Sequence, residues 1–242
     1  MKVYIQSTDK NLPRNYNFYN AYQGFYEMGF EIIMFHTPKK LETSAKNDII
    51  IGYVSTVRNR LSDFRIQTPD IDYPEELRKY MNRKIWYSKI NTINSHPELW
   101  PLFVKPVEDK KFTGIVVNSP KDLIGCGSCY ENTDVICSEV IPIQTEWRVF
   151  VRYGKILDVR PYKGDWRKHF NADIIEAAVK DYVSAPAGYA IDFGVTDKGE
   201  TVLIEVNDGY SLGCYGLFYI DYAKLLSARW AELTNTEDDC KF

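Results

Sequence analysis

The stretch Val202–Gly209, with the sequence VLIEVNDG, combines apolar residues with several oxygen-bearing side chains. Its apolar residues are typical of a buried strand, and Glu205, Asn207 and Asp208 lie at the end of that strand. An earlier apolar stretch, YAIDFGVT, contains a single carboxylate, Asp192. Carboxylate and amide oxygens are the ligands that hard cations such as Mg²⁺ prefer. These residue types therefore point to metal chemistry, provided that the fold brings the two stretches together.

A predicted hairpin joins the two stretches. The sequence TDKGET between them is a turn signal, so we expect antiparallel pairing with Thr196 opposite Thr201. In this register Asp192 lies directly opposite Glu205, with Cβ atoms about 4.5–5.5 Å apart, and Asn207 shares the face of Glu205. Like charges in such a pair repel each other unless a cation lies between them. The pattern indicates either a divalent-metal site or an ordinary hairpin with a solvated polar face.

Two lysines suggest a ligand that carries phosphates. Lys105 lies in the apolar sequence LFVKPV, and a lysine in such a strand either meets an anion or points to solvent from a sheet edge. Lys111 lies in EDKKFTG, a short basic turn suited to folding over phosphates, although a solvated charged loop has the same composition.

A second predicted hairpin carries further charged residues. The sequence EWRVFVRYGKILDVRPY alternates as paired strands do and turns at Tyr153-Gly154. Glu146 and Arg148 share one strand face, and Arg160 and Lys163 follow on the return strand. Arginine and lysine side chains either stabilise the negative charge of a transferring phosphoryl group or form cross-strand ion pairs.

The remaining elements predict a mixed fold with an α/β beginning. The first third is expected to form a small parallel or mixed sheet from strands Lys2–Ser7, Glu31–His36 and Asp48–Val54 with helix Asn17–Met28, followed by a helix at Pro74–Trp86. Beyond it, the expected elements are strands Leu102–Val107, Gly114–Ser119 and Val135–Ile141, the two hairpins, and helices Ala172–Tyr182 and Ile220–Leu233. The last two-thirds are therefore α+β with antiparallel sheets.

Composition narrows the choice of partners. The 242 residues are 45% hydrophobic and 26% charged, as in globular proteins, and the net charge of −3 argues against nucleic-acid or anionic-membrane partners. Met1–Ser7 resembles a first strand and not a signal peptide, and no apolar run approaches the ~18 residues of a membrane span. Together with five cysteines, an odd number, this predicts a cytoplasmic protein with reduced thiols. The sequence CGSC, Cys126 to Cys129, fits a zinc or redox pair, but isolated thiols are favoured because no second pair lies at metal spacing.

The order of these features resembles the ATP-grasp superfamily. The sequence runs from VKP, which contains Lys105, through the basic turn to CSEVIP, a strand that ends in glutamate. Glu146 then opens a hairpin, and the pair IDF and IEVN follows. FVKP and DKKFTG together with EWRVFV resemble more closely the clade named for an arginine and two lysines. The resemblance covers roughly residues 84–220 and implies an ATP-grasp fold, α+β with a small N-terminal α/β domain.

The resemblance also implies domains and residue roles. It implies an N-terminal domain at 1–83 and an ATP-grasp domain at 84–242, divided into subdomains 84–140 and 141–242. Lys105 and Lys111 would contact phosphates, Glu139 and Ile141 would offer backbone groups to adenine, and Glu146 would hold the ribose. Metal ligation of one or two Mg²⁺ would fall to Asp192, Glu205 and Asn207. The residues expected near the γ-phosphate or an acyl phosphate are Arg148, Arg160 and Lys163.

The function that this resemblance implies is an ATP-dependent carboxylate–amine ligase acting through an acyl phosphate. Its substrates would be a small-molecule or peptide carboxylate and an amine, whose identity the sequence does not specify, and its oligomeric state is open. Two alternatives remain at this stage: an ATP-binding adaptor or regulatory module without ligase activity, and a small-molecule kinase of the same fold.

Overall fold

A computed structural model describes residues 1–108, 111–127 and 130–242. The chain forms two compact units, a first unit made of Met1–Tyr80 and Gln144–Phe242 and a second unit made of Met81–Ile143. The predicted domain boundaries at residues 83 and 140 stay a prediction.

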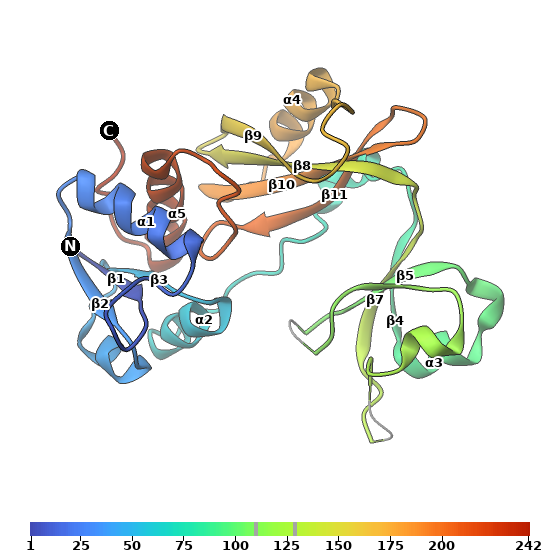
Figure 1. Cartoon of the computed structure of the whole chain (residues 1–242), viewed down its shortest axis with the longest axis horizontal. Helices are drawn as coiled ribbons and strands as arrows, with labels where there is room; N and C mark the ends of the chain where they lie inside the picture. Colours follow the sequence, from blue (N-terminus) through green and yellow to red (C-terminus); the bar gives the residue numbers. More distant parts are fainter. Residues whose placement is uncertain (109–110, 128–129) are drawn as a thin grey trace. The chain divides into compact units, whose positions relative to one another are not determined.

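The first unit contains a parallel sheet near the N-terminus. Its strands are β1 (Lys2–Gln6), β2 (Glu31–Phe35) and β3 (Ile49–Ile51), in the order β2-β1-β3 (Figure 1). All three were predicted, since each is a short stretch rich in apolar residues. Two helices belong to the same region, α1 (Tyr16–Glu27) and α2 (Val54–Asp63). Helix α2 was not predicted, because the expected strand Asp48–Val54 ends at Ile51 and the chain turns into the helix instead.

The cap of α2 explains why its start was not visible locally. Its N-cap residue, Tyr53, supplies no side-chain cap of its own. The side chain of Gln6 at the end of β1 accepts hydrogen bonds from the Tyr53 backbone N–H (3.1 Å) and from the Thr56 hydroxyl (3.2 Å). A residue almost fifty positions away therefore satisfies the helix start, which a search for local capping residues does not find.

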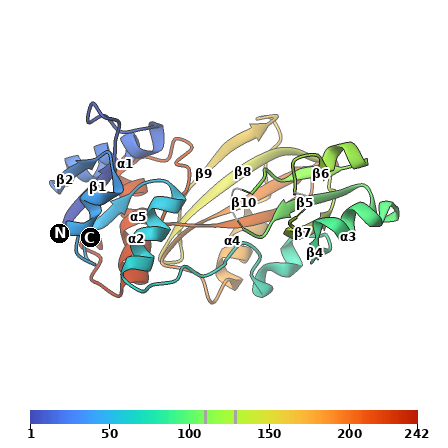
Figure 2. The same ribbon diagram turned by 90° about the horizontal axis from the view of Figure 1, so that it is seen from below.

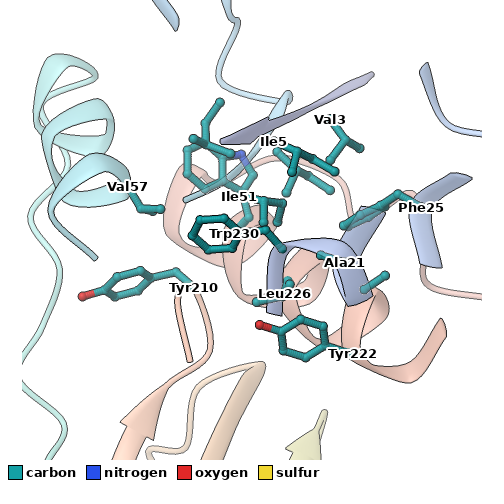
Figure 3. Close-up of a cluster of buried hydrophobic side chains, with 14 of the residues drawn as sticks. Val3, Ile5, Ala21, Phe25, Ile51, Val57, Tyr210, Tyr222, Leu226 and Trp230 are labelled. Carbon is teal, nitrogen blue, oxygen red and sulfur yellow. The ribbon is translucent and has the colours of Figure 1, made fainter. Parts of the chain in front are cut away.

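Helix α5 (Tyr219–Thr234) joins the C-terminal part of the chain to this sheet. Figure 3 shows Trp230 and Leu226 of α5 among Ile5 of β1, Ile51 of β3 and Val57 of α2. These side chains are at most 3% exposed and belong to one apolar core. The core therefore fixes the two ends of the chain as one packed body.

Helices α1 and α5 pack side by side, and Gly24 lies where they touch (Figure 1). A Cβ added at Gly24 would lie 2.2 Å from the Tyr219 carbonyl oxygen and 2.7 Å from the Ala223 Cβ. We expect Gly24→Ala to lower the free energy of unfolding by about 1–3 kcal/mol, because the helices must separate. Urea denaturation measures this change.

A neighbouring substitution provides the control for Gly24. Gln23→Ala removes a hydrogen bond to Glu27 on the helix surface, for which we expect a loss of at most ~0.5 kcal/mol. A stabilised Gly24→Ala protein would contradict the prediction, since alanine favours an unobstructed helix position by about 0.5–1 kcal/mol.

The second sheet of the first unit is antiparallel. Its strands are β8 (Ile143–Arg152), β9 (Lys155–Gly164), β10 (Gly188–Thr196) and β11 (Thr201–Asp208), in the order β11-β10-β8-β9 (Figures 1 and 2). Both predicted hairpins are present. The first turns at Tyr153 and Gly154, whose φ values of 49° and 71° suit the tight turn that matches strand twist. Helix α4 (Ala172–Asp181), also predicted, lies between the hairpins in sequence.

The second unit is built on another antiparallel sheet. Its strands are β4 (Ile85–Lys89), β5 (Leu102–Pro106), β6 (Ile115–Val117) and β7 (Asp134–Glu139), in the order β4-β7-β5-β6, with a short helix α3 (Ile90–Ser95). The predicted helix Pro74–Trp86 was wrong. A 3₁₀ turn at Glu75–Tyr80 takes its place, and Ile85 begins a strand that pairs with β7.

Among the described residues, the helices are too short or too polar to cross a membrane. The predicted cytoplasmic location stays a prediction.

Candidate functional site

The β10–β11 hairpin brings the predicted metal ligands together. Asp192 is directly opposite Glu205, which confirms the expected pairing, and Asn207 follows two residues later on β11. The expected pairing of Thr196 with Thr201 was wrong, because Thr201 lies opposite Val195. One extra residue on β11, between the pairs Phe193–Leu203 and Asp192–Glu205, corrects the register.

This extra residue, Ile204, forms a β-bulge that decides which side chains face Asp192. Without the bulge, the register of the turn would place Ile204 opposite Asp192, and Glu205 would face the other side of the sheet. Bulges of this kind are common beside active sites, where they redirect a side chain. The bulge therefore places two carboxylates on one face of the hairpin.

Asp192 lies at the centre of a buried polar network. Its two carboxylate oxygens accept hydrogen bonds from Nε (2.7 Å) and Nη2 (2.6 Å) of Arg148 on β8, the neighbouring strand. Its Oδ2 atom also accepts from the Asn207 amide (3.1 Å) and more weakly from the Tyr162 hydroxyl (3.4 Å). Asp192 is 1% exposed and Arg148 is 6% exposed, so water screens this ion pair very little.

Two tyrosine rings flank the guanidinium of Arg148. Its central carbon lies 4.8 Å from the centre of the Tyr215 ring and 5.6 Å from that of Tyr162, and the two rings contact each other. Burial alone would lower the pKa of Arg148, but the hydrogen bonds and charge of Asp192 outweigh it and raise this pKa. Burial, followed by the charge of Asp192, raises the pKa of Tyr162. At neutral pH the network therefore contains a charged Arg148 and a neutral Tyr162.

The sequence did not identify Tyr162 and Tyr215 as site residues. Tyr215 lies in the loop after β11 and has a φ of 40°, a left-handed conformation that costs a bulky residue of order 1–3 kcal/mol. Its side chain is 45% exposed, so one part of the ring contacts Arg148 while another part reaches solvent. Gly216, which follows Tyr215 and has a φ of 84°, is a sequence signal for a turn at this point of the loop.

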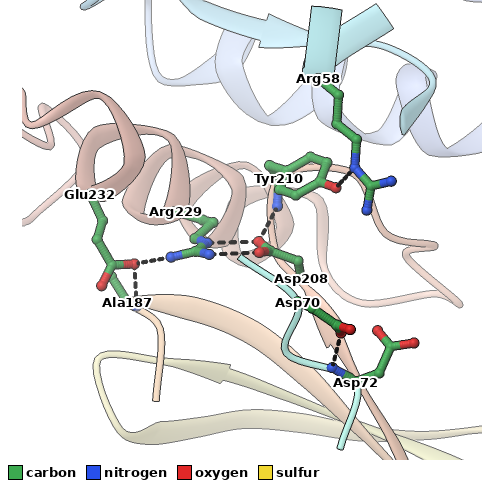
Figure 4. Close-up of polar contacts among 8 residues, drawn as sticks. All are labelled: Arg58, Asp70, Asp72, Ala187, Asp208, Tyr210, Arg229 and Glu232. Carbon is green, nitrogen blue, oxygen red and sulfur yellow. Dashed lines mark hydrogen bonds and ion pairs between the residues drawn. The ribbon is translucent and has the colours of Figure 1, made fainter. Parts of the chain in front are cut away.

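The loop after β11 is fastened to the N-terminal part of the first unit. The Ser211 hydroxyl donates to the Gly52 carbonyl (2.8 Å), and the Asn17 side chain accepts from the Cys214 backbone N–H (3.0 Å). The Tyr210 hydroxyl accepts a hydrogen bond from Arg58 of α2 (2.6 Å), as Figure 4 shows. Tyr215 is thus carried by a loop with fixed ends.

Asp208, which follows the predicted ligands, has a structural partner. Both of its oxygens accept hydrogen bonds from Arg229 of α5, at 2.7 and 2.6 Å (Figure 4). Arg229 also donates to Glu232 at 2.7 Å. Asp208 therefore ties the end of β11 to α5, whereas Glu205 and Asn207 face Asp192.

The other predicted residues of the first unit form surface ion pairs. Lys163 Nζ lies 2.6 Å from Glu146 Oε1, directly across the β8–β9 pair. Arg160 lies opposite Arg148 and donates to Asp158 on its own strand (2.7 Å). Cross-strand and local ion pairing thus describe the contacts of Lys163 and Arg160, and the phosphate roles of these residues remain predictions.

The remaining predicted residues belong to the second unit. Lys105 lies on β5 opposite Ile136 of β7, and Lys111 forms ion pairs with Glu108 (3.0 Å) and Glu131. Glu139 ends β7, where its carboxylate accepts from the Lys84 backbone N–H (2.8 Å). Ile141 follows β7. Lys110 of the predicted basic turn and Cys129 of the CGSC sequence lie outside the described residues, while Cys126 is a buried thiol.

The donors around Asp192 suit magnesium and not a metal held by protein alone. Within residues 1–108, 111–127 and 130–242, three or more His, Cys, Asp or Glu side chains do not gather as a metal-binding group. Two carboxylates and one amide do gather, at Asp192, Glu205 and Asn207. Magnesium is usually bound by one or two carboxylates, with substrate phosphates and water completing its shell. The residues therefore fit a cation that arrives with a phosphate ligand.

A family model described as an ATP-grasp domain, R2K clade family 2, matches residues 80–225, more than half of the chain. The chain belongs to this ATP-grasp family. The match confirms the predicted family and the predicted clade, and it makes the chain an enzyme of the ATP-grasp type that uses ATP. The hairpin of Asp192 and Glu205 lies inside the matched region.

Solved structures confirm the ATP-grasp fold. N5-carboxyaminoimidazole synthetase from Staphylococcus aureus superposes with a TM-score of 0.57 at 12% identity, covering 98% of this chain and 77% of that one. D-alanine–D-alanine ligase from Bacillus anthracis, complexed with ATP, has a TM-score of 0.57 at 14% identity and covers 98% of both chains. At these identities the likeness concerns the fold alone. No curated protein matches the ATP-grasp chain in sequence.

Proposed function

We propose that this ATP-grasp enzyme is an ATP-dependent carboxylate–amine ligase. A substrate carboxylate would attack the γ-phosphorus of ATP, releasing ADP and forming an acyl phosphate. An amine would then attack the acyl carbon, inorganic phosphate would leave with the C–O bonding electrons, and the amine would lose a proton to give an amide. Phosphoryl transfer of this kind needs positioning and charge neutralisation and little covalent help from the protein.

The observation that carries the proposal is the pairing of Asp192 with Glu205 beside Arg148. Two carboxylates of the β10–β11 hairpin and the guanidinium of Arg148 on the neighbouring strand β8 provide groups for a cation and for a phosphoryl oxygen at neighbouring positions. The names of the two similar structures, a synthetase and a ligase, support the ligase over a non-catalytic adaptor. The second name gives D-alanine as a substrate, which supports small-molecule substrates for this chain, and a peptide carboxylate or amine is part of the same proposal.

The residue roles form part of the proposal. Asp192, Glu205 and Asn207 would hold one or two Mg²⁺ ions, which supply positive charge to the phosphates. Arg148, and with it Arg160 and Lys163, would stabilise negative charge on the transferred group. In the second unit, Lys105 and Lys111 would serve the phosphates. Glu139 and Ile141 would serve adenine, and Glu146 of the first unit would serve the ribose.

Product analysis tests the proposed reaction. We expect the purified protein with Mg²⁺ and ATP to release ADP over many turnovers only when a carboxylate and an amine are both present, because without the amine the acyl phosphate is not consumed. Panels of amino acids and short peptides supply both substrates. Mass spectrometry should find a product equal to the two substrates minus one water. A stable product heavier than one substrate by one phosphate, formed in the presence of the amine without any amide, would identify a kinase, and nucleotide binding without ADP release across the panels would favour the adaptor. Either result would contradict the ligase.

A further inference from the structure

The contact between Arg148 and Asp192 joins a predicted metal ligand to a competing cation. The guanidinium occupies both carboxylate oxygens at 2.6–2.7 Å, and the carboxylate has almost no contact with water. Glu205 lies directly opposite Asp192, so a divalent ion shared by these two carboxylates would lie within a few ångströms of the guanidinium. Little water is available there to screen the repulsion between the two cations.

We propose that Arg148 is a built-in counter-ion of Asp192, and that its two-pronged contact and a divalent cation at Asp192 exclude each other. The inference rests on the proposed function, because it takes Asp192 as a ligand of the metal that accompanies ATP. Without metal, Arg148 neutralises the buried carboxylate. With metal, Asp192 exchanges the guanidinium for the ion, and Arg148 becomes available to the negative charge of the reacting groups.

The surroundings of Arg148 make this exchange feasible. A guanidinium that left Asp192 and found no other favourable contact would remain as a costly buried charge. The rings of Tyr162 and Tyr215 both lie within 6 Å of Arg148, a range in which aromatic faces attract a cation. They provide favourable contacts that do not depend on Asp192. Arg148 therefore influences metal binding through Asp192 and not by contacting the ion. Tyr215, whose ring contacts Arg148, belongs to the loop after β11.

Exclusion has a thermodynamic consequence that can be measured without turnover. If the guanidinium contact and the metal compete, anything that loosens the contact tightens metal binding by the same free energy. Arg148→Lys keeps the positive charge but loses the planar fork that matches a carboxylate. We expect Arg148→Lys to bind Mn²⁺, in the presence of ADP, about tenfold more tightly than the unaltered protein, a change equivalent to 1.4 kcal/mol.

Arg229→Lys is the matched control for this substitution. Arg229 forms the same two-pronged contact, with Asp208, at distances of 2.7 and 2.6 Å in the same unit. Its loss should lower the melting temperature without changing the Mn²⁺ dissociation constant. Equal or weaker Mn²⁺ binding by Arg148→Lys would overturn the proposal, as would equal tightening in both variants.

Nuclear magnetic resonance follows the contact directly in the unaltered chain. With ¹⁵N-labelled arginine, the buried Nε–H groups of Arg148 and Arg229 should both give slowly exchanging signals, because each donates to a carboxylate at 2.7 Å. The Arg148 signal is identified by its absence in Arg148→Lys. We expect MgCl₂ added to the ADP-bound protein to shift the Arg148 signal and leave that of Arg229 in place, whereas ADP with EDTA should move neither.

The outcomes separate this inference from the proposed function. If Mg²⁺ binds with ADP and the Arg148 signal stays in place, the exchange is wrong while the ligase proposal stands. If both signals move, the change is general and the exchange is again wrong. If neither the unaltered protein nor Arg148→Lys binds Mn²⁺ at millimolar concentration with ADP, both the metal site and the exchange are refuted.

Discussion

Glu205→Gln is expected to lower the rate of ATP-dependent ADP release by more than about 100-fold, since even residues that only orient metal ligands are worth 10–100-fold. Glutamine keeps the size of the side chain but removes one of the two carboxylates that face each other on the β10–β11 hairpin. Glutamine can also still form hydrogen bonds, so the variant should keep a cooperative melting transition. A coupled assay of ADP release and a thermal melt measure the two effects.

The same hairpin offers the control. Glu200 lies at its exposed turn, away from Asp192, so Glu200→Gln should retain full activity. Loss of less than tenfold in Glu205→Gln would show that Glu205 does not hold the metal. Glu205 gives a clearer test than Asp192, because removing Asp192 also leaves Arg148 buried without its carboxylate, and inactivity could then follow from unfolding.

The parts of this site that could be predicted are those that depend on the local pattern of apolar and polar residues along each strand. In both hairpins the strands consist of alternating apolar and polar residues or of continuous apolar residues, and a clear turn sequence joins them. Both hairpins are present where the sequence predicted them. The pairing of Asp192 with Glu205 was also predicted correctly, although the predicted pairing of Thr196 with Thr201 near the turn was wrong. The bulge at Ile204 corrects it. A bulge depends on how β11 packs against its neighbours, and residue types along a single strand do not reveal it.

Contacts between distant segments account for the rest. The sequence indicated Arg148 and Asp192 as site residues with separate roles, but their direct pairing requires that β8 and β10 be neighbours in the sheet. Likewise, helix α2 was missed because Gln6 of β1 caps it. The family match supplies the order of the motifs, and the structure adds which side chains satisfy one another.

Arg148→Met should be the most destabilising single substitution at the site. It leaves Asp192, 1% exposed, as a buried carboxylate without its main partner, which typically costs about 3–5 kcal/mol. For a chain of this size that corresponds to a fall in melting temperature of roughly 10 °C. Lys163→Met serves as the control, because its ion pair with Glu146 lies at the surface and should contribute at most ~1 kcal/mol.

A double substitution shows whether the loss comes from the stranded charge. Arg148→Met combined with Asp192→Leu replaces the buried ion pair by apolar groups, an exchange that is often neutral or stabilising. We therefore expect the double variant to recover most of the stability lost by Arg148→Met, while remaining inactive because a predicted metal ligand is gone. Urea unfolding of the unaltered protein, Arg148→Met, Asp192→Leu and the double variant forms a double-mutant cycle, which gives the coupling energy between Arg148 and Asp192. If the double variant were as unstable as Arg148→Met, the cost would lie in lost packing against Tyr162 and Tyr215, and the ion pair would not be what holds β8 and β10 together at this point.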